Sequence, residues 1–309
     1  MNLFKGVALA VIAAASSGAY AEAPLPCDRA CLLDQAEKYL TALTAHDAAS
    51  LPLDQGVIFT ENTIRLNTTE GLWERADALG PFKVLVPDTA AQQVGLLVSL
   101  KEAGQPVLLG ARLKISRGKI TEIETIVARN GMTSIPLPEN VSQRATLPIF
   151  TEHLNPAEKS PREKMLHATN QYFEGIEQNS GDIVPFDDSC NRVENAVQTT
   201  NNPALLPPGM PADSPLAKGC REQFNGGGMF WTMPERRVWA VDEETGNVIG
   251  AFTFSSKLPE VVDEKVPPMM RPLLAHNTIA EMFKIKNGRI YQIEAVIGPM
   301  LPYGQRSGW

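Results

Sequence analysis

The 309-residue sequence lacks the motifs that mark most kinds of enzyme site. It has only 4 histidines and 4 cysteines, and it contains no histidine-rich metal motif, no glycine-rich phosphate loop and no Gly-x-Ser-x-Gly nucleophile turn. The usual sequence motifs of metal-binding, phosphate-binding and serine-hydrolase sites are therefore absent. We expect that any catalysis needs no cofactor and no metal.

Basic charge is also scarce. The 28 lysines and arginines are outnumbered by 35 aspartates and glutamates, the net charge is −7, and no basic cluster is present. An acidic protein is repelled by nucleic acids and by anionic membranes. We expect no nucleic-acid partner.

No apolar run is long enough to span a membrane. The run 7–15 falls far short of the roughly 20 residues that a spanning helix needs. Residues 1–21 instead carry one lysine, this run, and Ala19-Tyr20-Ala21 before Glu22, the pattern of a secretory signal cleaved after Ala21. The alternative is a membrane anchor, which the short run disfavours. The mature chain is expected to be periplasmic or secreted and free of the membrane.

The few cysteines predict disulfides, because an even number in an oxidising compartment is usually paired. Cys27 and Cys31 are four residues apart at the start of a predicted helix, where the Cα atoms lie about 6 Å apart. Cys190 and Cys220 bracket the proline-rich start of an insertion. We favour these two local pairs among the three pairings available. A zinc site is the competing interpretation, and it lacks companion histidines.

The sequence repeats itself. Glu61-Asn62 matches Glu194-Asn195 at an offset of 133, and the segment 112–124 matches 282–294 at an offset of 170. The two offsets differ by 37, so the second copy is enlarged between its matching parts. Two copies of one domain follow.

Each copy has the pattern of an α+β unit. Apolar residues recur at helical spacing over 31–45, and alternating runs separated by hairpin-type turns follow up to residue 128. A helix followed by an antiparallel meander is the simplest interpretation. The predicted boundaries are a signal peptide at 1–21, a first domain at 22–132, a linker at 133–160, and a second domain at 161–309 with an insertion at about 198–228.

At Thr60-Glu-Asn, Glu70-Gly-Leu-Trp73, the segment 118–125 and the closing segment 302–309, the chain resembles the SnoaL-like group of the nuclear transport factor 2-like superfamily. More closely, it resembles a family of exported tandem-domain proteins. The resemblance covers nearly the whole mature chain. It implies two cone-shaped (cystatin-like) domains, each with helices wrapped by a curved antiparallel sheet around a pocket, packed as a pseudo-dimer within one chain.

That superfamily includes ketosteroid isomerases, dehydratases, polyketide cyclases and a lyase, and also non-catalytic modules. The resemblance implies a cofactor-independent lyase, dehydratase or isomerase acting on a small, apolar and aromatic or polyketide-like molecule. The alternatives are a non-catalytic ligand-binding protein and a structural tandem-domain protein. Each is compatible with a homo-oligomer.

Glu194 is the candidate general acid or base, because a carboxylate in an apolar cone has a raised pKa. Its first-copy counterpart is Glu61. The alternative is a strand-end device, in which the following asparagine turns the chain and the glutamate pairs with Arg65 or Arg192. In the segment Arg236-Arg237, strand alternation should turn one arginine inward, and Arg237 is the candidate group for stabilising an anion, paired with Glu194 or with the ligand.

Glu124 and Glu294 occupy the same point of the last strand in each copy, and Arg112 lies on the strand before Glu124. The simplest interpretation is a cross-strand ion pair. The alternative is that Arg112 and the glutamates form a polar pocket floor.

Trp73 and Trp231 follow glycine-containing turns and are candidate walls of a pocket for a flat ligand, as is Tyr303. The alternative is that they fill the core. Asn195 is placed with Glu194 at the predicted site. We expect the second copy to carry the function, since it alone has the insertion and the aromatic segments.

Overall fold

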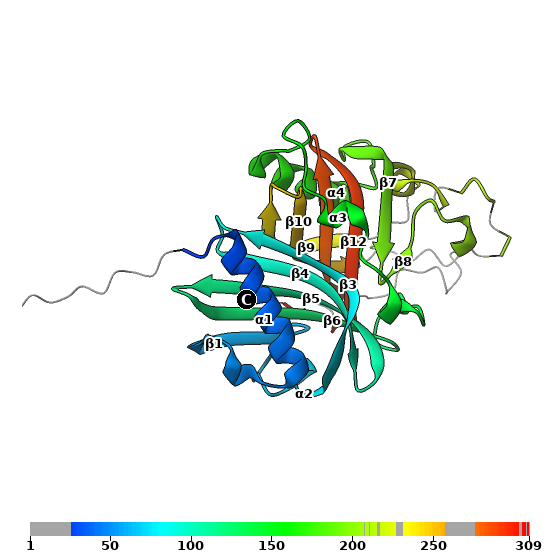
Figure 1. The fold of residues 1–309 in the computed structure, drawn as a ribbon. Helices are drawn as coiled ribbons and strands as arrows, with labels where there is room; N and C mark the ends of the chain where they lie inside the picture. The colour runs from blue at the N-terminus through cyan, green and yellow to red at the C-terminus, as the bar shows by residue number, and fades with distance from the viewer. Residues whose placement is uncertain are drawn as a thin grey trace, which may run out of the picture.

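The computed structural model describes residues 26–206, 208–209, 211–214, 217–226, 231–256, 276–302, 305–306 and 308. The predicted signal peptide and Tyr303 lie outside the described residues. The described chain forms two six-stranded sheets, each covered on one face by helices (Figure 1).

The first copy contains nine elements. In chain order they are α1 (Arg29–Ala45), η1 (Ala48–Ser50), β1 (Leu53–Glu61), β2 (Ile64–Leu66), α2 (Leu72–Arg75), β3 (Ala76–Asp88), β4 (Gln93–Glu102), β5 (Gln105–Ser116) and β6 (Lys119–Arg129). The sheet order is β2-β1-β6-β5-β4-β3. The strands β3 to β6 form the predicted antiparallel meander, whereas β1 joins it in parallel to β6.

The second copy repeats this order of α-helices and strands. Its described elements are α4 (Arg162–Gln178), β7 (Phe186–Glu194), β8 (Val197–Gln198), η3 (Pro203–Leu205), α5 (Cys220–Asn225), β9 (Trp231–Asp242), β10 (Asn247–Ser256), β11 (His276–Lys286) and β12 (Arg289–Met300). The sheet order is β8-β7-β12-β11-β10-β9, and β7 is parallel to β12. The two copies therefore share one topology, and the predicted fold class of two tandem α+β domains is confirmed.

The repeated Glu-Asn pairs end β1 and β7. Asn62 and Asn195 have φ of 48° and 49°, and the residue after each has φ of 73° and 66°. Two successive residues with positive φ are typical of the tight hairpin turns that match strand twist. Each asparagine Oδ1 also accepts a hydrogen bond from a strand of its own sheet, Asn62 from Val127 N at 2.9 Å and Asn195 from Ile297 N at 2.8 Å. The prediction that asparagine turns the chain is confirmed.

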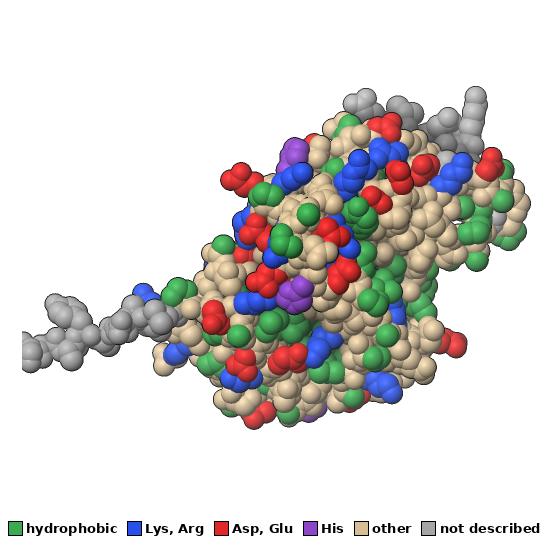
Figure 2. All heavy atoms as spheres, turned by 45° about the horizontal axis from the view of Figure 1, so that its top comes forward, with side chains coloured by type: hydrophobic (Ala, Val, Ile, Leu, Met, Phe, Trp, Pro, Cys, Tyr) green, Lys and Arg blue, Asp and Glu red, His purple; other side chains and the backbone are tan. Residues whose placement is uncertain are grey.

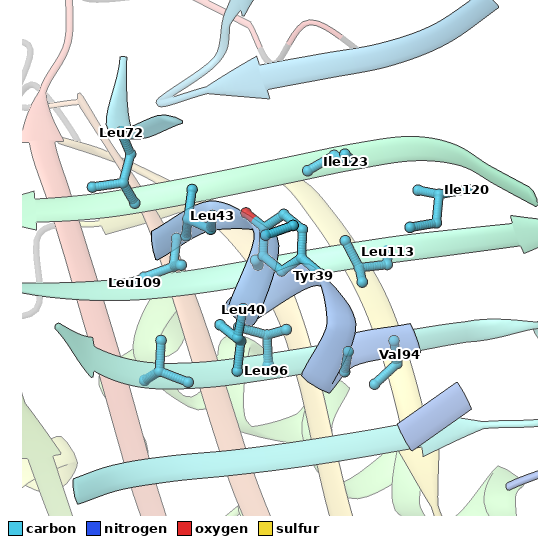
Figure 3. Close-up of a cluster of buried hydrophobic side chains, with 14 of the residues drawn as sticks. Tyr39, Leu40, Leu43, Leu72, Val94, Leu96, Leu109, Leu113, Ile120 and Ile123 are labelled. Atoms are coloured by element: carbon cyan, nitrogen blue, oxygen red, sulfur yellow. The ribbon is translucent and has the colours of Figure 1, made fainter. Parts of the chain in front are cut away.

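Helix α1 forms because its ends are capped and one face is apolar. The Asp28 side chain accepts a hydrogen bond from Cys31 N at the N-terminus, and His46 closes the C-terminus with a left-handed conformation. The buried face of the helix lies across the sheet (Figure 3). Each leucine buried there contributes about 2 kcal/mol. The side chains labelled in this cluster are Tyr39, Leu40, Leu43, Leu72, Val94, Leu96, Leu109, Leu113, Ile120 and Ile123.

The other faces of the two sheets pack against each other, and their strands cross at a steep angle (Figure 1). Two glycines allow this close approach. A Cβ on Gly95 would lie 2.3 Å from Ile249 Cγ2, and a Cβ on Gly110 would lie 2.3 Å from Ala280 Cβ. The predicted packing of the copies as a pseudo-dimer within one chain is confirmed.

The connecting segment covers one edge of this interface. It contains η2 (Val141–Gln143) and α3 (Pro148–Thr151), and Val141 and Phe150 belong to the same buried cluster as the facing sheets. The segment between the copies is therefore packed rather than a free tether.

Both predicted disulfides are present, Cys27–Cys31 with Cα atoms 5.3 Å apart and Cys190–Cys220 with Cα atoms 5.7 Å apart. Within the described ranges, none of the helices has the length and apolar character needed to cross a membrane. Acidic and basic side chains are interspersed on the face shown in Figure 2, so that face carries no broad patch of one sign.

Candidate functional site

Two charged residues of the second copy replace apolar residues of the first. At the offset of 133, Arg192 stands in the place of Phe59, and at the offset of 170, Glu281 stands in the place of Ala111. Phe59 and Ala111 belong to the apolar core under α1. Arg192 and Glu281 are as deeply buried in the second copy, with exposures of 5% and 1%. Burying charge costs free energy, so these positions mark a departure from simple core packing.

Arg192 is held by residues of its own strand, β7, and of α5. Its Nη2 donates to Glu194 Oε1 at 2.9 Å, and its Nη1 donates to Gln223 Oε1 at 2.5 Å. The guanidinium also lies 5.4 Å from the centre of the Phe224 ring. Gln223 and Phe224 come from α5, which the Cys190–Cys220 disulfide ties to β7. The insertion therefore supplies part of the binding environment of Arg192.

Glu281 lies inside the second cone beside Arg192. Its Oε1 accepts a hydrogen bond from the Tyr172 hydroxyl of α4 at 2.7 Å, and its Oε2 has no hydrogen-bond partner among the described residues. Burial raises the pKa of Glu281 to about 7, although Arg192 and the Tyr172 hydrogen bond oppose the rise. A buried carboxyl group with a raised pKa is therefore present in this cone at Glu281, a residue that the sequence analysis did not single out.

A cavity of about 300 Å³ opens beside this cluster. Its lining is mostly apolar with one charged wall and comprises Ser134, Ile135, Ile176, Arg192, Glu194, Gln223, Trp231, Phe254, Asn277, Ile279 and Ile297. Trp231 and Phe254 meet edge to face, with ring centres 6.2 Å apart. The predicted residues Glu194 and Trp231 thus line the same cavity. Glu281 lies behind Arg192 and does not line it.

In the first copy, Glu61 occupies the place of Glu194 and does not line the cavity of about 360 Å³ that opens beside its partner Arg129. Glu61 Oε1 accepts from Arg129 Nη2 at 2.7 Å and its Oε2 accepts from Leu72 N at 2.8 Å. Gly71 is needed for this contact, because it has φ of 63° and a Cβ there would lie 2.6 Å from Glu61 Oε2. The partner expected for Glu61 was Arg65, and Arg129 takes its place. Glu61 acts in this copy as a strand-end anchor.

Arg237 does not meet Glu194, contrary to expectation. Its Nη1 and Nη2 donate to Glu124 of the first copy at 2.7 and 2.5 Å. Arg236 is the residue that faces its own cone, where it pairs with Glu177 of α4 at 2.7 Å. Neighbouring residues of a strand lie on opposite faces of the sheet, so only one of the two arginines can face the cone. Bulges shift the register of β9 against β10, and sequence alternation therefore does not determine which arginine that is.

Arg112 and Glu124 form the predicted cross-strand ion pair, with Nε and Oε2 3.2 Å apart. The pair lies between the two sheets, where Trp239 Nε1 also donates to Glu124 Oε2 at 3.0 Å. Glu294 has the equivalent place in the second copy and binds Arg144 of the connecting segment at 2.6 and 2.7 Å. The alternative, in which these residues form a pocket floor, does not hold, because they belong to the interface between the copies.

Of the other predicted residues, Trp73 fills the first core, with its ring 5.6 Å from that of Tyr39. Asn195 binds the connecting segment through Thr133 Oγ1 and Ile135 O, both at 2.8 Å, and Ile135 lines the cavity. Asn195 therefore shapes the cavity rim from outside. Tyr303 lies outside the described residues.

The sequence did contain a signal for Arg192 and Glu281. A charged residue at position 281 interrupts the apolar side of β11, and the aligned first-copy residue is alanine. A search for positions where the copies differ in charge would have found both residues. The positions that the two copies share include the Glu-Asn pairs, which have structural roles.

The cluster has the groups needed for proton transfer. Glu194 places a carboxyl group at the cavity, Arg192 supplies positive charge at the same wall, and burial raises the pKa of the nearby Glu281 to about 7. Over the ranges that the structure describes, no group of three or more His, Cys, Asp and Glu side chains is placed to hold a metal ion.

A family model described as a domain of unknown function (DUF8021) matches residues 158–297, most of the second copy. Among curated proteins, none matches this chain.

Solved structures are similar to a little under half of this chain. A protein assigned as a polyketide cyclase from Xanthomonas campestris pv. campestris has 11% identity and a TM-score of 0.28, and the match covers 44% of this chain and 92% of that one. A protein assigned as an isomerase from Bacillus subtilis has 11% identity and a TM-score of 0.29, with 44% and 88% covered. A protein assigned as a SnoaL-like polyketide cyclase from Jannaschia sp. CCS1 has 13% identity and a TM-score of 0.28, with 47% and 90% covered. The fold class of this chain follows from its own sheets and helices.

Proposed function

We propose that the second copy is an isomerase or lyase that moves a proton on a small, mostly apolar molecule without a cofactor. The observation that carries this proposal is the Arg192–Glu194 ion pair in the wall of an apolar cavity of about 300 Å³, backed by the buried Glu281. The first copy has apolar residues at the positions of Arg192 and Glu281, so the fold does not require these charges.

Glu194 is the group that takes the proton from the bound molecule, because it lines the cavity. Arg192 stabilises the oxyanion that develops when a proton leaves a carbon next to a carbonyl group. Glu281 and Tyr172 hold Arg192 from behind, and Glu281 changes the charge of the cluster as it titrates. Trp231 and Phe254 favour a flat or aromatic substrate.

Export to the periplasm or the medium is part of the proposal. The two disulfides and the signal-like segment 1–21 support it, because disulfides persist in oxidising compartments.

Exchange of carbon-bound hydrogen tests the proposal without knowledge of the substrate. The protein is incubated in D₂O with a panel of small ketones and aromatic ketones, and deuterium uptake at carbon is followed by NMR and mass spectrometry. We expect the wild-type protein to accelerate uptake for at least one member. Glu194→Gln keeps size and hydrogen bonding but removes the base, so it should reduce this rate about 100-fold or more.

Glu61→Gln is the matched control, since it makes the same change at the equivalent position of the first copy. It should leave exchange within a few-fold of wild type. Equal rates in wild type and Glu194→Gln would refute the assignment of the base. Loss in Glu61→Gln alone would move the active site to the first copy.

The second candidate function is ligand binding without turnover. It is favoured by the closed pairing of Arg192, whose two Nη atoms are already bound by Glu194 and Gln223. In this case, members of the same panel would quench tryptophan fluorescence, and the Trp231→Phe variant would lose that response, while no deuterium is taken up.

A further inference from the structure

A second cavity lies on the opposite face of the second sheet. It has a volume of about 230 Å³ and is lined by Thr232, Pro234, Glu235, Thr253, Ser255, His276, Gln305 and Arg306. Phe254 and Asn277 line the first cavity, whereas their neighbours Ser255 and His276 line this one. Successive strand residues point to opposite faces, so the sheet itself separates the two cavities.

Ser255 and His276 are directly opposite each other on β10 and β11, and Ser255 Oγ lies 2.6 Å from His276 Nδ1. The other ring nitrogen, Nε2, contacts the backbone carbonyl oxygen of Gln305. A carbonyl oxygen only accepts hydrogen bonds, so Nε2 carries the hydrogen. In the neutral ring, Nδ1 is then the acceptor nitrogen, and the Ser255 hydroxyl donates to it.

The fold does not need this pair. The aligned positions of the first copy hold Lys101 and Pro106, which face each other in the same register on β4 and β5. Ser255 and His276 are 6% and 3% exposed, and a serine bound to an oriented histidine base is the arrangement that activates a hydroxyl nucleophile. In the common triads, Nε2 faces the serine and Nδ1 faces the group that orients the ring. Here Nδ1 faces Ser255 and Nε2 faces the orienting carbonyl group, so the two nitrogens exchange places and each role is kept.

We propose that Ser255 is a nucleophile with His276 as its general base, in a second site that takes small carboxylic esters. Ser255 Oγ forms a bond to the ester carbonyl carbon while its proton passes to His276 Nδ1. The carbon–oxygen bond to the alcohol then breaks, and the leaving oxygen takes that proton. Water hydrolyses the resulting acyl-serine by the same two transfers, so that ester and water give acid and alcohol.

The remaining lining fits this chemistry. Among the described lining residues, the Thr253 hydroxyl and the Arg306 guanidinium are candidate donors to the tetrahedral oxygen, and the small volume limits the acyl group to a short chain. Gln305 is fixed by the hydrogen bond from its Nε2 to Thr63 Oγ1 of the first copy at 2.7 Å. The turn after β1 therefore supports the carbonyl group that orients His276.

The test uses the whole disulfide-bonded chain and phenylmethanesulfonyl fluoride, which reacts covalently with activated serines. Intact mass and peptide mapping should show one adduct, on Ser255, in the wild-type protein. p-Nitrophenyl acetate should be hydrolysed, and prior labelling should abolish that hydrolysis. The mapping needs no variant, so a folding defect cannot obscure it.

Two variants complete the test. His276→Gln keeps a hydrogen-bonding side chain but cannot take up the proton, and it should slow labelling and hydrolysis about 100-fold or more. Ser116→Ala removes an exposed hairpin serine and should leave both rates unchanged. An adduct on any other residue, no adduct, or an unchanged rate in His276→Gln would overturn the proposal.

Discussion

Arg29, at the start of α1 in the first copy, binds Asp242 at the end of β9 in the second copy through two hydrogen bonds of 2.6 and 2.9 Å. The reciprocal contact joins Arg162, at the start of α4, to Asp88 at the end of β3, at 2.7 Å. Arg29 and Arg162 are 133 positions apart, so the repeat carries both contacts. Each copy thus uses its first helix to hold the last residue of a strand in the other.

Loss of one of these contacts should destabilise the protein. Asp242 is buried and Arg29 is partly exposed, so Arg29→Ala leaves a buried carboxylate with backbone and hydroxyl donors only. We expect a loss of about 3 kcal/mol in the free energy of unfolding, measured by urea denaturation. Arg162→Ala is the matched variant and should behave alike. A loss below about 1 kcal/mol in both would show that the contacts are incidental.

The stability of the protein should depend on pH through Glu281. Its pKa rises from 4.5 to about 7 on folding, so its contribution to stability is complete below about pH 4.5 and is lost as pH rises through 7. The difference corresponds to roughly 3 kcal/mol. Between pH 5 and pH 8, the wild type should therefore lose stability relative to Glu281→Gln, which has no proton to lose. The exposed Glu163→Gln variant is the control, and parallel pH profiles for wild type and Glu281→Gln would contradict the assignment.

Arg192 and Glu281 should behave as a coupled unit. Arg192→Phe alone leaves Glu281 and Glu194 without their cation. It should lower the free energy of unfolding by about 3–5 kcal/mol. Arg192→Phe combined with Glu281→Ala recreates the first-copy residues at both positions, and it should be more stable than the single Arg192→Phe variant by at least about 1 kcal/mol. Additive losses in the double-mutant cycle would show that the two side chains do not interact.

The two disulfides should differ in their contribution to stability. Cys190–Cys220 closes a loop of 30 residues and Cys27–Cys31 a loop of 4, which corresponds to about 4 and about 2 kcal/mol in the chain-entropy model. The double variant Cys190→Ala, Cys220→Ala should also release α5. Arg192 would then lose Gln223, one of its hydrogen-bond partners. We therefore expect weaker ligand binding in this variant and unchanged binding in the Cys27→Ala, Cys31→Ala variant, measured by tryptophan quenching.

Short-range patterns predicted the fold well. The Glu-Asn repeats located the ends of β1 and β7, and the cysteine spacings predicted both bridges, because each depends on residues close in sequence or on a constant offset. The parallel pairing of β1 with β6 was not predicted, since it joins segments on either side of the whole meander.

The site was predicted only in part. Glu194 and Trp231 line the cavity as expected, but Arg237 was assigned to the wrong side of its strand. The pKa of Glu281 is raised because α4 packs over this residue of β11 and buries it. That contact joins segments far apart in the chain, so no local sequence pattern predicts it. The facing of Ser255 and His276 depends on strand register, which sequence spacing does not determine.

The contact between the sheets has a consequence for how this protein can vary. A dimer of identical chains would present every residue of that face twice, so Glu124 and Glu294 would have to bind the same partner. Here Glu124 binds Arg237 and Glu294 binds Arg144 of the connecting segment. Two copies joined in one chain need not have the same residue at equivalent positions, so the second copy can bury Arg192 and Glu281 where the first copy has Phe59 and Ala111.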